Sequence, residues 1–211
     1  IGLNPGLAGS AIFIALCIDA VTDPLMGTIS DRTNTSLGRR HPYMMISFIP
    51  MSLGYIFLFA PRQDWDMSQS DLFIWMTIFT VLTRIGMTLF DIPHRAFGGE
   101  VTKNYKERTI LMSWREMVGW VAGLSNAFLG YGIFFASTPE YPQGQLNPDA
   151  WFPFAVTGAI FMIISVLYSS LSTKDEIKSL SKWSGSISLI DIIKELKIAI
   201  SNRAFLIFFF G

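Results

Sequence analysis

The stretch Ile18-Asp19-Ala20-Val21-Thr22-Asp23-Pro24-Leu25-Met26-Gly27 decides how the chain folds, because it places two carboxylates inside a run that is otherwise apolar enough to cross a membrane. An aspartate near the centre of a bilayer-spanning helix costs roughly 2.5–3.5 kcal/mol. Four residues apart on an α-helix, Asp19 and Asp23 are about 40° apart around the axis and about 6 Å apart along it. They therefore share one helix face, on which their oxygens can converge on one cation.

The composition indicates a polytopic membrane protein rather than a soluble domain. Apolar residues make up 51% of the 211 residues, charged residues make up 15%, and the formal net charge is zero. A neutral balance gives no reason to expect nucleic acid as a partner. The single cysteine, Cys17, excludes a disulfide framework within the chain.

Hydropathy divides the chain into membrane spans and loops. Five segments are long and apolar enough to cross a bilayer, and they are 6–30, 42–60, 72–97, 109–136 and 151–172. Because a lipid-facing backbone must satisfy its own hydrogen bonds, each span is expected to be a helix. We therefore predict an all-α membrane protein whose residues 1–172 form a transmembrane bundle.

The rest of the chain is expected to lead into a further helix. Residues 173–203 read as a loop that contains an amphipathic helix over 187–200, and 204–211 read as the start of the next transmembrane helix. The apolar run at the end is too short to cross a bilayer, and no initiator methionine opens the sequence. We therefore expect the chain to be a fragment of a longer, monomeric protein embedded in a lipid bilayer.

Basic residues are sorted between the loops. Twelve Lys and Arg residues lie in the alternate loops 31–42, 98–108 and 173–203, whereas the two opposite loops contain one, Arg62. By the positive-inside rule the basic loops are cytoplasmic. The first span is then expected to run from the outside to the inside.

Further charges lie within the spans. Arg84, Thr88, Asp91 and Arg95 follow one another at helical spacing, so they form a polar stripe that faces the bundle interior or water. Arg84 is expected to neutralise Asp91 from two turns away. Arg115 on the next span is placed either to form a structural ion pair with Asp91 or to belong with it to a ligand site, and spacing leaves both open.

At this point the residues resemble a known family. The motif Asp19-Ala-Val-Thr-Asp23-Pro-Leu-Met-Gly27, followed by Phe90-Asp91-Ile-Pro93 and Glu107-Arg108, is similar to the glycoside–pentoside–hexuronide:cation symporters of the major facilitator superfamily. The resemblance covers most of the chain. It implies a helical bundle of that superfamily, of which this chain holds about helices 2–6 and the start of helix 7.

The resemblance also implies a function. It implies cation-coupled symport of a glycoside, pentoside or hexuronide by alternating access, no enzyme activity, no cofactor, and Na⁺ or H⁺ as coupling ion. The family's binding site for the cation, which is Na⁺ if it is a metal, maps onto Asp19 and Asp23, with further oxygen ligands from Thr22 and Thr88. The sugar maps onto Asp91 and Arg115, with Arg84 beside them, and the membrane is expected to be a bacterial inner membrane.

A loop motif of the same superfamily is present as well. Gly27-x-x-x-Asp31-Arg32 followed by Gly38-Arg39-Arg40 resembles its signature loop between helices two and three. By that resemblance Asp31, Arg32, Arg39 and Arg40 pair with neighbouring helix ends and latch one conformation.

Two alternatives stay open. The first is a carrier of the same fold for lysophospholipid or another amphipathic solute. The second belongs to a different class, an intramembrane prenyltransferase in which Mg²⁺ bridges an Asp-x-x-x-Asp motif to a diphosphate. The prenyltransferase requires a second acid-rich cluster on another helix, and the remaining spans offer single acids.

Overall fold

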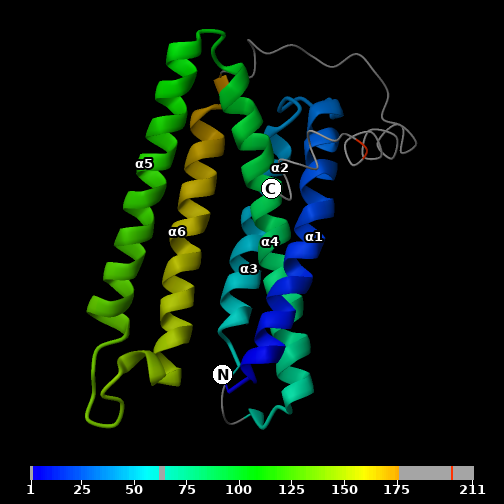
Figure 1. Ribbon diagram of the computed structural model, residues 1–211. Coiled ribbons are helices and arrows are strands. Elements are labelled where there is room, and N and C mark those ends of the chain that lie inside the picture. The colour runs from blue at the N-terminus through cyan, green and yellow to red at the C-terminus, as the bar shows by residue number, and fades with distance from the viewer. Residues whose placement is uncertain (1, 62–64, 176–200, 202–211) are drawn as a thin grey trace.

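The computed structural model describes residues 2–61, 65–175 and 201, and every described regular element in it is helical (Figure 1). The predicted amphipathic helix at 187–200 and the predicted helix start at 204–211 lie outside the described residues. The long helices are α1 (Pro5–Arg32), α4 (Gln69–Glu100), α5 (Tyr105–Leu129) and α6 (Trp151–Ser172). Successive helices run up and down the bundle, so the all-α architecture predicted from hydropathy is confirmed.

The starts of these helices carry sequence-encoded caps. The Asn4 side chain accepts a 2.9 Å hydrogen bond from the backbone N–H of Gly6 at the start of α1. Ser68 and Asp71 form a reciprocal capping box before α4, and Asn104 accepts from the N–H of Lys106 before α5. Each cap satisfies a backbone donor that has no partner within its helix.

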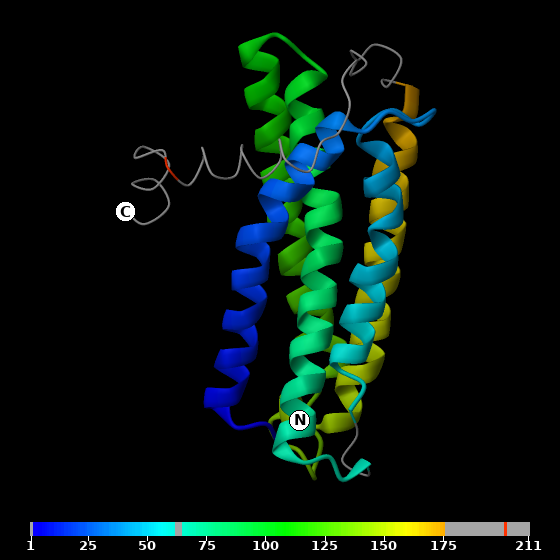
Figure 2. The same cartoon turned by 90° about the vertical axis from the view of Figure 1, so that its right-hand side faces the viewer.

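The prediction of one helix over 42–60 needs correction. The segment forms two helices, α2 (His41–Ile46) and α3 (Phe48–Leu58), which follow one another along the bundle (Figure 2). Pro50 is the physical reason, since it has no N–H to donate to the carbonyl of Ile46 and its ring crowds that carbonyl. At the junction the backbone N–H of Ser47 donates to the carbonyl of Tyr43 at 3.1 Å, and its hydroxyl donates to the carbonyl of Met44 at 2.7 Å. Among the described residues, four helical segments are individually long and apolar enough to cross a membrane, namely α1, α4, Tyr105–Phe134 and Pro148–Ser172.

Helix α4 is the centre of the described bundle, because it packs against α1 on one side and α3 on the other (Figures 1 and 2). Two glycines allow α3 and α4 to approach closely. A Cβ atom added to Gly54 would lie 2.6 Å from the backbone nitrogen of Thr83, and one added to Gly86 would lie 2.7 Å from the Cα of Met51. No larger residue fits at either position without moving a backbone.

Helix α5 lies at the edge of the described bundle (Figure 1). None of its residues is buried, and it continues into a short π-helix, η2 (Gly130–Phe134). Two 3₁₀ turns, η3 (Gly144–Leu146) and η4 (Pro148–Ala150), then lead into α6. The loop residues 33–40 and 101–104 lie together at one end of the bundle, which we call the basic end because it carries Arg39, Arg40 and Lys103.

Candidate functional site

The candidate site is a cavity of about 150 Å³ between α1 and α4. Its two walls are the acid-bearing face of α1 and the predicted polar stripe of α4, which the packing of the two helices brings together. The cavity is lined by Asp19, Asp23, Arg84, Met87, Thr88, Asp91 and Ile92. Helical spacing alone predicted that each stripe shares a face, and the structure shows that the two faces meet.

Asp19 is held by a guanidinium. Arg84 donates to Oδ2 of Asp19 across the α1–α4 interface. The prediction that Arg84 neutralises Asp91 is therefore wrong, because the facing carboxylate of α1 is a nearer partner than a residue two turns along the same helix. Oδ1 of Asp19 is buried and has no hydrogen-bond partner among the described residues.

Asp23 has a different environment. Its Oδ1 accepts a 2.7 Å hydrogen bond from the hydroxyl of Thr88 on α4. No ion pair with Asp23 is found in the part of the chain that the structure describes. Thr22, the other residue predicted to give an oxygen ligand to the cation, does not line the cavity. Its hydroxyl is buried and has no hydrogen-bond partner among the described residues.

Asp91 is paired twice. Arg115 of α5 donates to its Oδ1, and Nε of Arg95, one turn along α4, lies 2.7 Å from its Oδ2. The structure thus contains the ion pair between adjacent helices that the sequence left open. Arg115 also donates to its neighbour Glu116 at 3.1 Å, although the Glu116 side chain is 67% exposed.

Charges at the site are balanced. The three aspartates Asp19, Asp23 and Asp91 are matched by the guanidiniums of Arg84, Arg95 and Arg115. The positive charges are unevenly distributed, because two guanidiniums pair with Asp91 and only one, that of Arg84, pairs with the two acids of α1. The α1 side of the cavity therefore carries the surplus negative charge, which is the side on which a cation is best stabilised.

A second cluster of charges lies at the basic end. Arg40 donates to Asp31 at 3.1 Å through Nε and at 2.5 Å through Nη2, and its Nη1 lies 2.8 Å from Glu100. Arg39 also donates to Glu100. The predicted residues Asp31, Arg39 and Arg40 are thus brought together, while Arg32 is the last residue of α1. Glu100 was missed, because no sequence spacing relates the end of α4 to a loop some sixty residues earlier.

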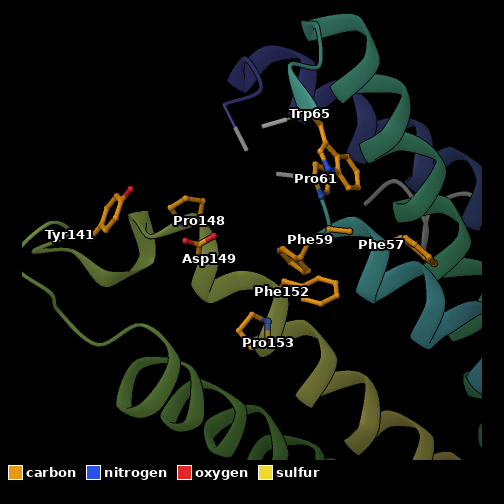
Figure 3. A pocket seen from close by; sticks show the side chains of 10 residues that line it. Phe57, Phe59, Pro61, Trp65, Tyr141, Pro148, Asp149, Phe152 and Pro153 are labelled. Atoms are coloured by element: carbon orange, nitrogen blue, oxygen red, sulfur yellow. The ribbon is translucent and has the colours of Figure 1, made fainter. Parts of the chain in front are cut away.

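Two larger cavities lie away from the acid pair. A cavity of about 590 Å³ at the opposite end is walled by aromatic and proline side chains, and Figure 3 shows Pro61 and Trp65 across it from Pro148 and Asp149. An apolar cavity of about 460 Å³ is lined by residues of α3, α4, α5 and α6, among them Met51, Phe161 and Met162.

Long apolar helices and a charged cavity between two of them define an integral membrane protein of the transporter class. The family model described as MFS/sugar transport protein matches residues 1–211, and the chain belongs to that family. The resemblance read from the sequence motifs is confirmed. Because this is a family of transporters rather than enzymes, the prenyltransferase alternative is wrong.

Curated relatives agree with this assignment. The chain is 31% identical over 178 residues to an uncharacterized symporter of Synechocystis, with 83% of this chain and 32% of the relative covered. It is 32% identical over 143 residues to a sodium-dependent lysophosphatidylcholine symporter of Danio rerio, with 65% and 25% covered. It is 25% identical over 179 residues to a lactose permease of Leuconostoc lactis, with 81% and 27% covered. The chain therefore spans about a quarter to a third of the length of these relatives.

Proposed function

We propose that this chain belongs to a secondary active transporter that couples the entry of a cation, Na⁺ or H⁺, to the uptake of a sugar or sugar derivative. The observation that carries the proposal is the acid pair of α1, which faces the polar stripe of α4 across one small cavity. Two acids within a membrane helix are costly and are kept where they bind ions or protons. The lactose permease among the relatives supports a sugar as substrate.

The cation is assigned to Asp19 and Asp23. The unpartnered Oδ1 of Asp19 is a free acceptor, and Asp23 carries a negative charge that no described cation neutralises. Thr88 supplies a hydroxyl oxygen next to Asp23, and Thr22 remains a further proposed ligand. This donor set consists of oxygens, which suits Na⁺ or a shared proton.

The substrate is assigned to the neighbouring charges. Asp91 and Arg115, with Arg84 on the same α4 wall of the cavity as Asp91, offer acceptors and planar donors that can hydrogen-bond sugar hydroxyls. Because cation and substrate would share one cavity, each can bias the same equilibrium between outward and inward states. We place the protein in a bacterial inner membrane as a monomer, with its basic end in the cytoplasm.

A second candidate substrate is a lysophospholipid. The apolar cavity of about 460 Å³ beside α5 and α6 offers room for an acyl chain, and one relative is named a lysophosphatidylcholine symporter. The charged cavity between α1 and α4 favours the sugar, because an acyl chain gains nothing from three aspartates and their guanidiniums.

Uptake by the full-length protein in proteoliposomes tests the proposal. A panel of glycosides, pentosides, uronides and lysophospholipids is offered with an imposed Na⁺ or H⁺ gradient, beside Asp19→Asn, Asp23→Asn and the control Asp149→Asn. Asp149 lines the aromatic cavity at the opposite end. Gradient-driven uptake lost in the first two variants and kept in the third supports the proposal. Uptake that ignores both gradients in all variants refutes the cation site.

A further inference from the structure

In the proposed coupling site, a positively charged side chain of the protein already pairs with one of the two acids. The guanidinium of Arg84 occupies one oxygen of Asp19, which is the carboxylate assigned to the coupling ion. Only Oδ1 of that carboxylate is left, and it is buried and has no partner in the part of the chain that the structure describes. A second positive charge on Asp19 would be repelled by the first, so an external cation and Arg84 compete for this acid.

Arg84 is placed to move. Its side chain is 35% exposed and lines the cavity, while that of Asp19 is only 17% exposed. Its released guanidinium would remain beside the site, because the backbone of α4 holds it there. The long, flexible stem of an arginine spans several ångströms without any helix movement.

No described acid at the site is free to receive the displaced guanidinium. Oδ1 of Asp91 already accepts from Arg115, and its Oδ2 lies 2.7 Å from Nε of Arg95 in an ion pair. Asp23 is the second ligand of the coupling cation in the proposed site. A guanidinium released into a cavity of low dielectric, without a counter-ion, is unfavourable.

The charge count of the site shows what the counter-ion must be. Asp19, Asp23 and Asp91 balance Arg84, Arg95 and Arg115, so the empty site is neutral when Glu116 is left out, because that second partner of Arg115 is 67% exposed and does not line the cavity. One bound cation raises the charge to plus one. A substrate with one negative group restores neutrality, and a guanidinium binds a carboxylate by two parallel hydrogen bonds.

We propose that Arg84 is a tethered counter-ion, which the coupling cation displaces from Asp19 and which then binds the carboxylate of an anionic sugar. The inference rests on the proposed function and deepens it. It makes the arginine the coupling element, because the substrate carboxylate finds its donor only after the cation has bound. Cation binding and anion binding then strengthen each other by the same factor.

Binding measurements on the full-length protein in nanodiscs test the inference. The ligands are glucuronate and galacturonate with their neutral parents glucose and galactose, each titrated with and without Na⁺ at two values of pH. In the wild type we expect the cation to tighten uronate binding about tenfold or more, and to change binding of the neutral parent much less.

Substitution of Arg84 isolates the contribution of this residue to the cation dependence of uronate binding. Arg84→Gln is expected to lose the tightening of uronate binding by the cation, and to bind the cation itself more tightly because the competitor is gone. Arg84→Lys should keep part of that tightening. Lys103→Gln is the control, since it removes a positive charge of the basic end that neither lines the cavity nor pairs with Asp19, Asp23 or Asp91 among the described residues. Thermal melting of each variant shows that it is folded.

Failure of this inference is distinguishable from failure of the proposed function. If Arg84→Gln binds uronate as the wild type does, with the same cation dependence, the exchange is wrong even though gradient-driven sugar uptake continues. If Asp19→Asn leaves gradient-driven uptake intact, the cation site itself is wrong. A wild type whose uronate binding is independent of the cation also overturns the exchange.

Discussion

Asp19 and Asp23 show how individual side chains offset the cost of burying acids. Each aspartate costs roughly 2.5–3.5 kcal/mol at the centre of a spanning helix. Asp19 recovers part of this through a charge-assisted hydrogen bond from Arg84, and Asp23 through the hydroxyl of Thr88. The compensation is incomplete, because Asp23 keeps an unbalanced charge within the described residues. This residual charge is what a coupling cation would neutralise.

At the scale of single residues, we predict that Thr88→Val weakens the binding of the coupling cation. Valine keeps the shape of threonine and removes the hydroxyl that bonds Asp23 at 2.7 Å. In the proposed site the oxygen of this hydroxyl is also a ligand of the cation, so losing about 1.4 kcal/mol of that interaction should raise the cation concentration for half-maximal uptake about tenfold. The measurement is sugar uptake against cation concentration in proteoliposomes.

Two controls accompany this variant. Thr88→Ser keeps the hydroxyl and should behave as the wild type. Thr77→Val removes a hydroxyl that bonds only to the Phe73 carbonyl of its own helix, at 2.7 Å, and should leave the cation dependence unchanged. Equal cation dependence in Thr88→Val and the wild type would show that this hydroxyl is not part of the site.

Helical spacing predicted which polar side chains share a face of the candidate cavity, whereas it did not predict their partners, and the binding roles of these residues stay predictions. An interval of four placed Asp19 and Asp23 on one face, and intervals of four and three did the same for the α4 stripe. Helical spacing says nothing about which neighbouring helix a stripe meets, so Arg84 was assigned to Asp91 instead of Asp19. The Arg95–Asp91 pair is an i, i+4 contact, and its spacing alone would have revealed it.

At the scale of elements, α4 positions the site because α1 and α3 pack on its two sides. The contact with α3 depends on glycines, since the two backbones approach at Gly54 and Gly86. The positions of the spans followed from hydropathy, and α6 begins and ends at the predicted residues, 151 and 172. The break at Ser47 was missed, although Pro50 was the local signal for it.

We predict that Gly86→Ala destabilises the bundle. The added Cβ would lie 2.7 Å from the Cα of Met51, so the backbone of α3 must shift. Overpacking of this kind costs about 1–3 kcal/mol. The full-length protein in detergent should therefore melt at a lower temperature than the wild type.

The matched control for this variant is Gly119→Ala on α5. Apart from the neighbouring backbone of α5 itself, no atom of the described residues lies within 4 Å of a Cβ added there. Alanine at such a helical position reduces the freedom of the unfolded chain and should stabilise by about 0.4–1 kcal/mol. Opposite shifts of the melting temperature are expected for the two glycines, and a Gly86→Ala protein as stable as the wild type would contradict the tight α3–α4 contact.

At the scale of the whole molecule, the charges of the basic end connect three helices. Arg40 joins Asp31 at the end of α1 to Glu100 at the end of α4, and Arg40 itself precedes α2. The Arg40 side chain is only 5% exposed, so its ion pairs are screened less than surface pairs are. We propose that this network is the latch that the loop motif implies, holding the helix ends together in one transport state.

We predict that Glu100→Gln loosens the latch. The change removes a carboxylate that Arg39 and Arg40 share, and it leaves Arg40 with Asp31 alone among its described partners. Because Glu100 is 30% exposed, we expect its loss to destabilise the latched state by about 1.4 kcal/mol, near the low end for hydrogen bonds to charged groups. The population of the open state should therefore be about tenfold larger. Trypsin cleavage after Arg39 and Arg40, followed on the full-length protein in nanodiscs, measures that population.

Lys103→Gln is the control for the latch, because it removes a charge of the same end that forms no ion pair with the described residues. Its cleavage rate should equal that of the wild type, whereas Glu100→Asp should fall between the wild type and Glu100→Gln. If opening and closing are fast relative to cleavage, the rate follows the population of the open state, so a tenfold shift is read directly. Identical cleavage rates in the wild type and Glu100→Gln would show that the network joins the helix ends without controlling their opening.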